Sequence, residues 1–244
     1  EWRIAKREVC FTIPDNAVVM RKLSIEKNVR DEEIQGYLYL QLGTSIHLPF
    51  EEPVFDTVTL GEKDGQKEIL MFAASDDVVD SYRYLLEECK LKPAVADVSA
   101  LAVYRLYHAL DSERKGHLMV LQIDIHDVNA SVFVDDQPAF MRHFQISAER
   151  QEWEQGNGEG MRSWAYGKGE DFYFSNMRDV YTEIEKMLKF YVDKVSEDAE
   201  PATDILLTGD HPYLDRIITE MKDRFDQRIR TIDQQRIGVQ DGIV

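Results

Sequence analysis

The sequence predicts a mixed α/β fold, and three observations lead to that prediction. Short β-prone runs alternate with segments of helical apolar periodicity along the whole chain. Hydrophobic residues make up 43% of the 244 residues and aromatic residues 10%, which is typical of a folded protein rather than a disordered one. The chain is long enough for one large domain or for two smaller ones.

Two β-prone runs open the chain, at residues 9–13 and 18–25. Residues 14–16 (Pro-Asp-Asn) lie between them and are turn formers, so the pattern predicts a hairpin. Asp31 can cap a following helix, because apolar residues recur at helical spacing over residues 34–42.

A second pair of strands is predicted at residues 54–60 and 68–74. The intervening Asp64-Gly65 suits a tight hairpin turn. From residue 18 onward the predicted order is therefore strand, helix, strand, strand.

A helix is predicted to begin at Ser75 and to carry an apolar face as far as Cys89. It is expected to be amphipathic and half buried. Residues 93–98 follow as a short strand, and Ser99 begins another helix.

The second half opens with three consecutive β-prone runs, which predict an antiparallel meander over residues 118–125, 130–134 and 138–144. Residues 147–176 have no clear period and are interpreted as a long loop. The remaining predicted elements are a helix at 180–195, a strand at 204–208 and a helix at 214–225.

The charge balance excludes several classes of partner. With 29 basic and 46 acidic residues, the formal net charge is −17. A chain this acidic cannot neutralise a phosphate backbone or an anionic lipid surface, so nucleic acid and direct membrane association are not expected. Two cysteines without a CxxC pair, and no secretory leader, predict a reducing compartment and a cytoplasmic location.

Two strand ends carry residue types that can bind a nucleotide. A carboxylate at a strand end orients the water shell of Mg²⁺, and a following Gly admits phosphates to the backbone. Asp124 fits the first role, but His126 stands where Gly is needed. Thr208 and Gly209 follow a second strand and precede a helix, with Asp210 next to them. The alternative interpretations are a strand-end carboxylate satisfied by backbone N–H groups, and a simple turn and cap.

Other chemistry finds no support in the residue patterns. The six histidines lack metal-ligand spacing, so no zinc site is predicted. No nucleophile elbow or hydrolytic carboxylate pair can be assigned either, so no catalytic residue is proposed.

One apolar cluster, Leu48-Pro49-Phe50, lies outside every periodic element. It can serve as an exposed anchor for a partner peptide. The alternative is a loop folded back onto the neighbouring strands.

Several segments, taken in order, resemble the PilM family of type IV pilus assembly proteins, relatives of the cell-division protein FtsA. The segments are residues 46–52, 68–74, 85–98 and 183–191. The resemblance implies an actin-like (ribonuclease H-like) fold with an inserted strand-helix-strand-strand subdomain at about residues 18–75. It further implies a partial first lobe at residues 1–117 and a second lobe at residues 118–244.

The chain departs from the family pattern at each nucleotide loop. The first phosphate loop has no counterpart, because the chain begins near the last strand of that subdomain, so the N-terminal part of the first lobe is expected to be missing. In the second loop His126 and Ala130 replace the family Gly and Thr, although Ser131 offers a hydroxyl. The adenosine loop is reduced to Gly209.

The nucleotide-binding remnant implied by this comparison is Asp124, Ser131, Thr208 and Gly209. The departures argue against binding of ATP and Mg²⁺, and more strongly against turnover.

The resemblance implies a cytoplasmic scaffold of type IV pilus assembly, or of a related competence or secretion machine. Such a scaffold is held at the inner membrane by binding the N-terminal peptide of a PilN-like membrane protein, with Leu48, Pro49 and Phe50 as candidate contacts. The alternative is an actin-like ATPase that binds Mg-ATP and polymerises or changes shape. A sugar or acetate kinase lacks a recognisable substrate loop, and self-association is left open.

Overall fold

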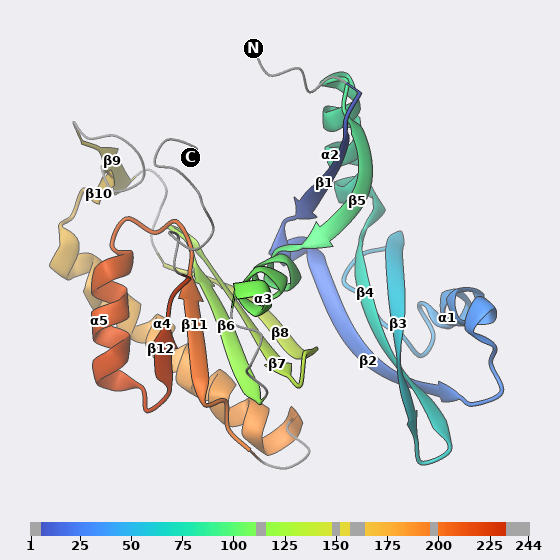
Figure 1. Ribbon diagram of the computed structural model, residues 1–244. Helices are drawn as coiled ribbons and strands as arrows, with labels where there is room; N and C mark the ends of the chain where they lie inside the picture. Colours follow the sequence, from blue (N-terminus) through green and yellow to red (C-terminus); the bar gives the residue numbers. More distant parts are fainter. Residues whose placement is uncertain (1–5, 111–115, 148–151, 157–163, 196–199, 233–244) are drawn as a thin grey trace. The chain divides into compact units, whose positions relative to one another are not determined.

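The computed structural model describes residues 6–110, 116–147, 152–156, 164–195 and 200–232 (Figure 1). The chain divides into two compact units, Glu1–Ser99 and Ala100–Val244, and each unit combines strands and helices. The division comes earlier than the lobe boundary expected after residue 117. The assignment of two actin-like lobes with that boundary stays a prediction.

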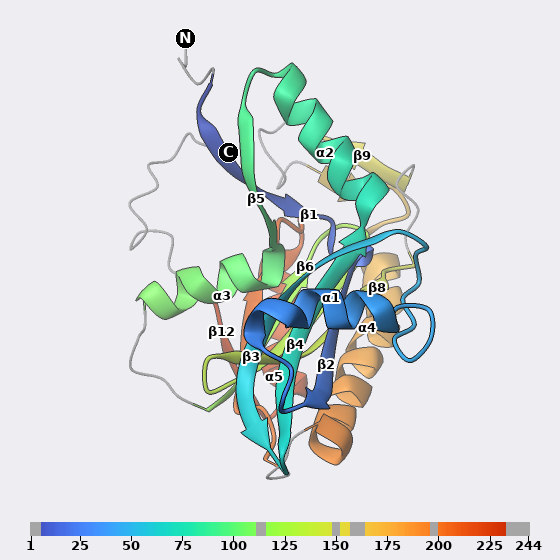
Figure 2. The same ribbon diagram turned by 90° about the vertical axis from the view of Figure 1, so that its right-hand side faces the viewer.

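A three-stranded antiparallel sheet forms the inserted part of the first unit, in the order β2-β4-β3. Its strands are β2 (Val18–Glu26), β3 (Pro53–Lys63) and β4 (Gln66–Ser75). Helix α1 (Ile34–Gln41) lies across one face of this sheet (Figure 2). The predicted order of strand, helix, strand, strand is therefore confirmed.

Helix α1 is held by its apolar side. Leu38 is 1% exposed and Ile34 is buried, whereas Leu40 on the opposite side is 82% exposed. The two buried side chains pack against the sheet in a core whose other members are Ile25, Ile46, Ile69, Met71 and Ala73. Burial of one helix face thus joins α1 to β4, the central strand.

The turns around this sheet follow their residue types, with one correction. Asp64 and Gly65 both have positive φ, as a two-residue hairpin turn requires, so the predicted hairpin is confirmed. Asp31, in contrast, does not cap the helix. It begins a short 3-10 turn, and its carboxylate accepts a hydrogen bond from the Lys67 ammonium at 2.7 Å.

The predicted hairpin of residues 9–13 with residues 18–25 is wrong. Strand β1 (Glu8–Ile13) pairs in parallel with β5 (Lys92–Val98), and β2 pairs with β4 instead. A 3-10 helix at Asp15–Ala17 separates β1 from β2, and the Ser99 hydroxyl donates to the Asp15 carboxylate at 2.6 Å. Local turn residues allow a hairpin but do not choose the partner strand, which depends on distant burial.

Helix α2 (Asp76–Glu88) has a partly buried apolar face, as expected, since Val78, Val79 and Leu86 are half-buried. It packs beside β1 and β5, and Tyr82 stacks on Phe11 with ring centres 6.2 Å apart. None of its residues is buried, however, and Leu85 is 59% exposed. The described residues therefore cover only part of the apolar face of α2.

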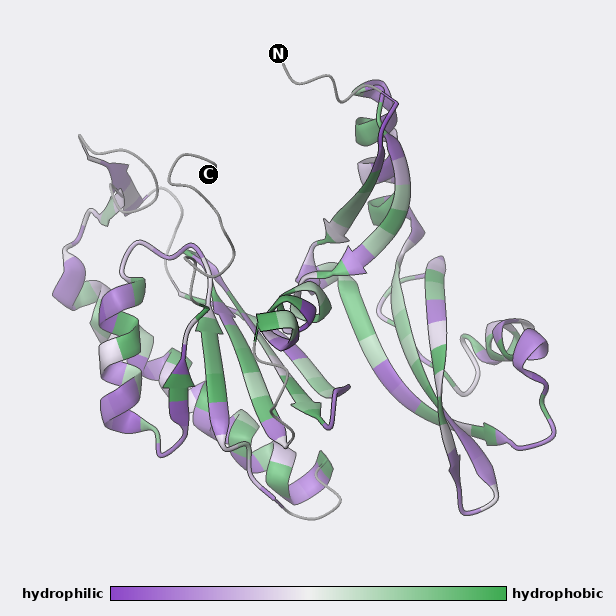
Figure 3. Cartoon of the chain, viewed as in Figure 1, coloured by the Kyte–Doolittle hydropathy of each residue, from purple (hydrophilic) through white to green (hydrophobic). Residues whose placement is uncertain are grey.

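The second unit has a five-stranded sheet in the order β12-β11-β6-β7-β8. Its central strands are largely hydrophobic (Figure 3). The strands are β6 (His117–Ile123), β7 (Asp127–Val134), β8 (Gln137–Gln145), β11 (Asp204–Thr208) and β12 (Arg228–Arg230). The predicted meander of β6, β7 and β8 is confirmed, whereas β12 has no counterpart in the sequence prediction.

Helices cover both faces of this sheet because its strands carry apolar side chains on both sides. Helix α3 (Ser99–Leu110) packs on one face, and α4 (Glu170–Phe190) and α5 (Leu214–Arg224) pack on the other. None of the helices within the described residues is both long enough and apolar enough to cross a bilayer.

The long loop expected at residues 147–176 is partly structured. Strands β9 (Trp153–Gln155) and β10 (Trp164–Tyr166) form a short hairpin, and α4 already begins at Glu170. Trp153 is buried against Tyr166 and Tyr173, which explains how a segment without apolar periodicity becomes ordered. Residues 148–151 and 157–163 of the expected loop lie outside the described residues.

Replacing Leu38 by Ala should lower the free energy of unfolding of the first unit by about 2–5 kcal/mol, because a fully buried side chain leaves a cavity. Leu40→Ala, two residues along the same helix, should change it by less than about 0.5 kcal/mol. Chemical denaturation of both variants measures the difference. Equal effects would contradict the packing of α1 on the sheet.

Candidate functional site

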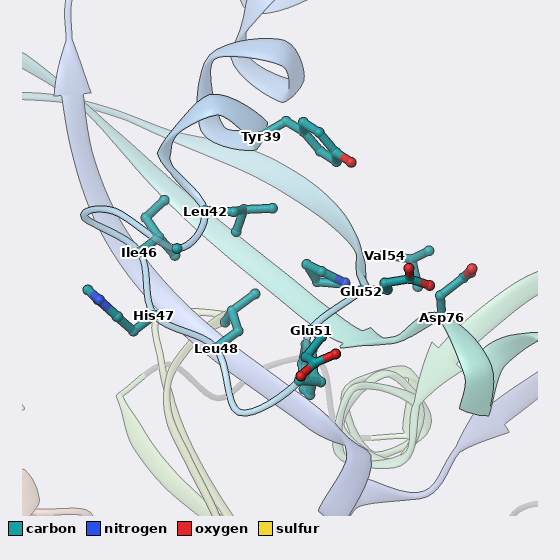
Figure 4. A pocket seen from close by; sticks show the side chains of 12 residues that line it. Tyr39, Leu42, Ile46, His47, Leu48, Glu51, Glu52, Val54 and Asp76 are labelled. Atoms are coloured by element: carbon teal, nitrogen blue, oxygen red, sulfur yellow. The ribbon is translucent and has the colours of Figure 1, made fainter.

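A cavity of about 570 Å³ lies in the first unit, between α1, the loop at residues 42–52, the start of β3 and the start of α2 (Figure 4). Tyr39 of α1 lines this cavity. The apolar wall consists of Leu42, Ile46, Leu48, Phe50 and Val54. A cavity of this size can receive one or two large side chains of a ligand.

Two residues of the cluster Leu48-Pro49-Phe50 both pack on the core and line this cavity. Leu48 and Phe50 are partly buried and pack against the core beneath α1, and both line the cavity. Pro49 is exposed and does not line it. The loop is therefore folded back onto the sheet and still presents two side chains to the cavity. That these residues contact a partner stays a prediction.

The rim of the cavity is acidic. Glu51, Glu52 and Asp76 line it, and none of the described residues around it is a Lys or Arg. The backbone N–H of Asp76 donates to the carbonyl oxygen of Glu52 at 2.9 Å, which fastens the loop to the first turn of α2. Figure 4 shows Glu52 and Asp76 on one side of the cavity, next to Val54. Such a rim favours a ligand with a positive charge.

A second cavity, of about 190 Å³, lies on the side of the sheet away from α1. Residues 54–56 of β3 line it together with residues of β1, β2, β4, β5 and α2. Val54 thus lines both cavities.

Sequence analysis did not identify Tyr39, Val54 or Asp76 as site residues. One sequence signal could have indicated Val54. Val54, Asp56 and Val58 alternate with Phe55 and Thr57, so two valines lie on the more exposed face of β3.

In the second unit the structure brings Asp124 next to Asp210. Asp124 follows β6, and its carboxylate accepts a hydrogen bond from the backbone N–H of Asp210 at 3.3 Å. Burial, together with hydrogen bonding and repulsion from the Asp210 carboxylate and repulsion from Asp127, raises the pKa of Asp124 to about 6. The described residues thus hold negative charge where a phosphate binder needs positive charge or free N–H groups.

Gly209 has a packing role in this arrangement. Its φ is +127°, and a Cβ atom at this position would lie 2.1 Å from the carbonyl oxygen of Ile123. The missing side chain therefore makes room for the end of β6. The space that a glycine opens for phosphate in a nucleotide loop is here filled by the chain itself.

Thr208 and Ser131 lie farther from Asp124. Thr208 is paired with Gln122 in the sheet, and Ser131 is paired with Val120 and is 2% exposed. Val120 precedes Asp124 by four residues, so Ser131 is displaced by about 13 Å along the strand. The structure brings together Asp124 and Gly209 but does not add Ser131 to them.

A polar row that sequence analysis missed crosses the α3 face of this sheet. Thr208, Gln122 and Asn129 lie at one register level of β11, β6 and β7, and the ring nitrogen Nδ1 of His143 lies 2.7 Å from the Asn129 side-chain oxygen. Only the pairing register reveals this row, since the residues come from distant segments.

The loop after Gly209 is anchored by His211, which is 3% exposed. Its Nδ1 accepts the backbone N–H of Tyr213 at 3.0 Å, so the neutral ring carries its proton on Nε2, which lies 2.6 Å from the Tyr173 hydroxyl. Burial lowers the pKa of His211 to about 4, with a smaller contribution from His126. The loop is therefore tied to α4 through an uncharged imidazole.

Gly209 is packed against Ile123, and the carboxylates of Asp124 and Asp210 repel one another. That the nucleotide-binding residues of the second unit are a degenerate remnant stays a prediction. Within the described ranges, no group of three or more His, Cys, Asp or Glu side chains is arranged to hold a metal ion.

Comparison with known families matches residues 1–151 to the family described as type IV pilus assembly protein PilM. Among solved structures, one described as a "PilM-PilN type IV pilus biogenesis complex" contains a similar chain. The two share 19% sequence identity, with a TM-score of 0.68, over 93% of this chain and 70% of that one. This likeness shows a shared fold and confirms the expected actin-like α/β architecture.

A Bacteroides thetaiotaomicron protein described as having an actin-like ATPase fold and unknown function is 12% identical, over 93% of this chain and 68% of that one, with a TM-score of 0.41. Comparison with curated protein sequences gives no significant match.

Asp124→Asn should stabilise the second unit at neutral pH. Because the folded-state pKa of about 6 lies above the ordinary 3.8, ionised Asp124 disfavours the folded state above pH 6. The shift corresponds to about 3 kcal/mol, which solvent screening of a partly exposed carboxylate reduces to about 1–2 kcal/mol. As the pH falls from 6 towards 3.8 the native protein takes up the proton first, so the difference between variant and wild type should vanish.

Urea unfolding at several pH values measures this difference in stability. Asp223→Asn, at an exposed position of α5, is the matched control and should show no such pH-dependent gain. An Asp124→Asn variant that is no more stable than wild type at pH 7 would contradict the assigned burial of, and repulsion on, the Asp124 carboxylate.

Gly209→Ala should destabilise the second unit by about 2–4 kcal/mol, because the new methyl group meets the backbone of Ile123 and the positive φ is strained. Gly116→Ala has a similar φ of +118° with no atom within 4 Å, so it should cost only about 1 kcal/mol. Thermal unfolding compares the two. Equal losses would show that the approach of Ile123 is unimportant.

Proposed function

This chain belongs to the family of type IV pilus assembly protein PilM, and from that premise we propose that it is a scaffold of type IV pilus assembly or of a related competence or secretion machine. Its first unit receives the N-terminal peptide of a PilN-like inner-membrane protein. The partner class comes from the similar solved structure, which is a complex of PilM with PilN.

The observation that carries the proposal is the 570 Å³ cavity with an apolar wall and an acidic rim. It lies within residues 1–151, the part of the chain that matches the family. Segments on the cytoplasmic side of a membrane span are enriched in Lys and Arg. A peptide that combines apolar and basic residues would therefore complement both the wall and the rim.

The proposed location follows from the proposed partner. A membrane-anchored PilN-like protein would hold this scaffold at the cytoplasmic face of the membrane, through its peptide and without insertion of the scaffold itself. The acidic composition supports a protein partner rather than direct binding to anionic lipid.

The proposal assigns no nucleotide turnover. Gly209 makes room for Ile123, and the carboxylates of Asp124 and Asp210 already repel one another without a phosphate nearby. These contacts support a scaffold over an actin-like ATPase for this chain.

Tyr39→Ala should weaken binding of the peptide about 5- to 30-fold, because Tyr39 lines the cavity and aromatic anchors dominate such contacts. Tyr39 is 65% exposed, so the substitution should leave the fold intact. Fluorescence anisotropy measures the Kd, with a labelled synthetic peptide that covers the cytoplasmic N-terminal segment of a PilN-like protein from the same genome.

Leu40→Ala is the matched control, since Leu40 is the next residue, is exposed and does not line the cavity. It should leave the Kd unchanged, and added salt should raise the Kd of the wild type because the rim is acidic. Failure of the peptide to bind the wild-type chain at low salt would contradict the proposal.

A further inference from the structure

A cavity of about 400 Å³ lies in the second unit, between α3 and the turn that joins β7 to β8. Its size is within the range of pockets that bind small molecules. Phe133, which lines it, comes six residues after Asp127 on β7 and so lies about 20 Å along the strand from it. The cavity shares no lining residue with the two cavities of the first unit, and none of the predicted nucleotide-binding residues lines it.

The wall of this cavity is apolar. Leu101 and Ala109 of α3 line it together with Phe133 and Pro138 of the hairpin. The Tyr104 ring stacks on Phe133 with ring centres 3.9 Å apart, and Phe133 is 1% exposed as part of the core beneath α3. A wall of this kind is fixed by packing and suits an aliphatic or aromatic group of a ligand.

Asp136 supplies a negative charge at the rim of the cavity. The Tyr104 hydroxyl donates to its Oδ1 at 2.6 Å, and Nε2 of His108 lies 3.5 Å from the same oxygen. Burial and the hydrogen bond to Asp136 raise the pKa of Tyr104, so the hydroxyl stays protonated and continues to donate. Within the part of the chain that the structure describes, no group donates to Oδ2 of Asp136, which can therefore accept from a ligand N–H group.

The backbone of the turn holds this carboxylate in place. Asp135 and Asp136 have φ of +45° and +69°, the left-handed pair that a two-residue hairpin turn requires. The bond from Tyr104 fastens the same turn to α3. A carboxylate that is already positioned in this way loses little freedom when a ligand binds.

Arg105 supplies a positive charge at the same rim. Its side chain lines the cavity from α3 and is exposed. It has an interaction within the chain, which a ligand would share or replace. A guanidinium group pairs two of its N–H groups with one carboxylate. The rim thus offers an acceptor for an ammonium group and donors for a carboxylate, on two different elements beside an apolar wall.

The two opposite charges decide between classes of ligand. A purely cationic molecule would be repelled by Arg105, and a purely anionic one by Asp136 and by the net charge of −17. A zwitterion places one charge at each side chain. Free α-amino acids with apolar side chains combine both charges with an apolar body, whereas a residue inside a polypeptide carries neither charge on its backbone.

We propose that this cavity binds a free apolar or aromatic α-amino acid, with its ammonium group at Asp136, its carboxylate at Arg105 and its side chain against Tyr104 and Phe133. Such a ligand would bridge α3 and the β7–β8 turn and would therefore stabilise the second unit. The inference goes beyond the proposed function, which concerns a peptide at the first unit.

Titration of the isotope-labelled full chain with L-phenylalanine, followed by NMR, tests the class of ligand, with L-leucine and L-tryptophan in parallel. Phenethylamine lacks the carboxylate, phenylpropionate lacks the ammonium group, and N-acetyl-L-phenylalaninamide lacks both charges. Each of these three should bind at least fivefold more weakly than L-phenylalanine, because it loses one or both charged contacts. Chemical shift changes should gather in α3 and at residues 133–138.

Two variants with matched controls test the rim. Asp136→Asn keeps an oxygen for the Tyr104 hydroxyl and suits the positive φ, so it should keep the Tm but raise the Kd of L-phenylalanine at least fivefold. Asp135→Asn, in the same turn but outside the cavity lining, should leave this Kd unchanged. Arg105→Gln should raise the Kd of L-phenylalanine at least fivefold but not that of phenethylamine. Arg178→Gln, at an exposed position of α4, is its control.

The outcomes decide the proposal without affecting the proposed function, whose peptide is measured separately. Tighter binding of the amino acid than of its analogues, lost selectively in Asp136→Asn and Arg105→Gln, would establish the site. The proposal is overturned if none of the three amino acids binds, if the shifts gather elsewhere, or if Asp135→Asn weakens binding as much as Asp136→Asn. Equal or tighter binding of N-acetyl-L-phenylalaninamide would also overturn it, and would assign the cavity to a side chain of a partner protein.

Discussion

Burial of β4 on both faces is the constraint on which the first unit depends. Met71 and Ala73 are covered by α1, and Leu70 and Ala74 on the opposite face are buried as well. β4 is also paired along both of its edges, with β2 and with β3, which therefore take the outer positions. The cavities beside β3 follow from that placement.

The same constraint explains why the cavity rim is ordered although it belongs to a loop. Leu48 and Phe50 pack on the core beneath α1, and the bond from Asp76 to Glu52 fixes the other end of the loop. The apolar wall is therefore preorganised, which lowers the entropy cost of receiving a ligand. The carboxylates stay at the surface, where they can attract a basic segment at long range.

In the second unit, the predicted nucleotide-binding residues contact other parts of the chain. The end of β6 occupies the space beside Gly209, and the neutral His211 ties the following loop to α4. Burial, with a smaller contribution from repulsion by Asp210, disfavours the ionised form of Asp124, so this residue is unfavourable for stability. These contacts within the chain hold the loop that follows β11 in place.

Periodicity and turn chemistry by themselves determined most of the elements, because these signals are local: the order of β2, α1, β3 and β4, the Asp64-Gly65 turn and the meander of the second sheet were all predicted correctly. Only the tertiary structure decided which strands pair, and the apparent hairpin of β1 with β2 proved wrong because partner choice depends on burial far along the chain. The cluster Leu48-Pro49-Phe50 was visible as a loop of apolar residues, but Val54 and Asp76 could join it only after β3 and α2 had been placed beside it. A site built from separate segments exists in the packing, and no single segment of the sequence contains it.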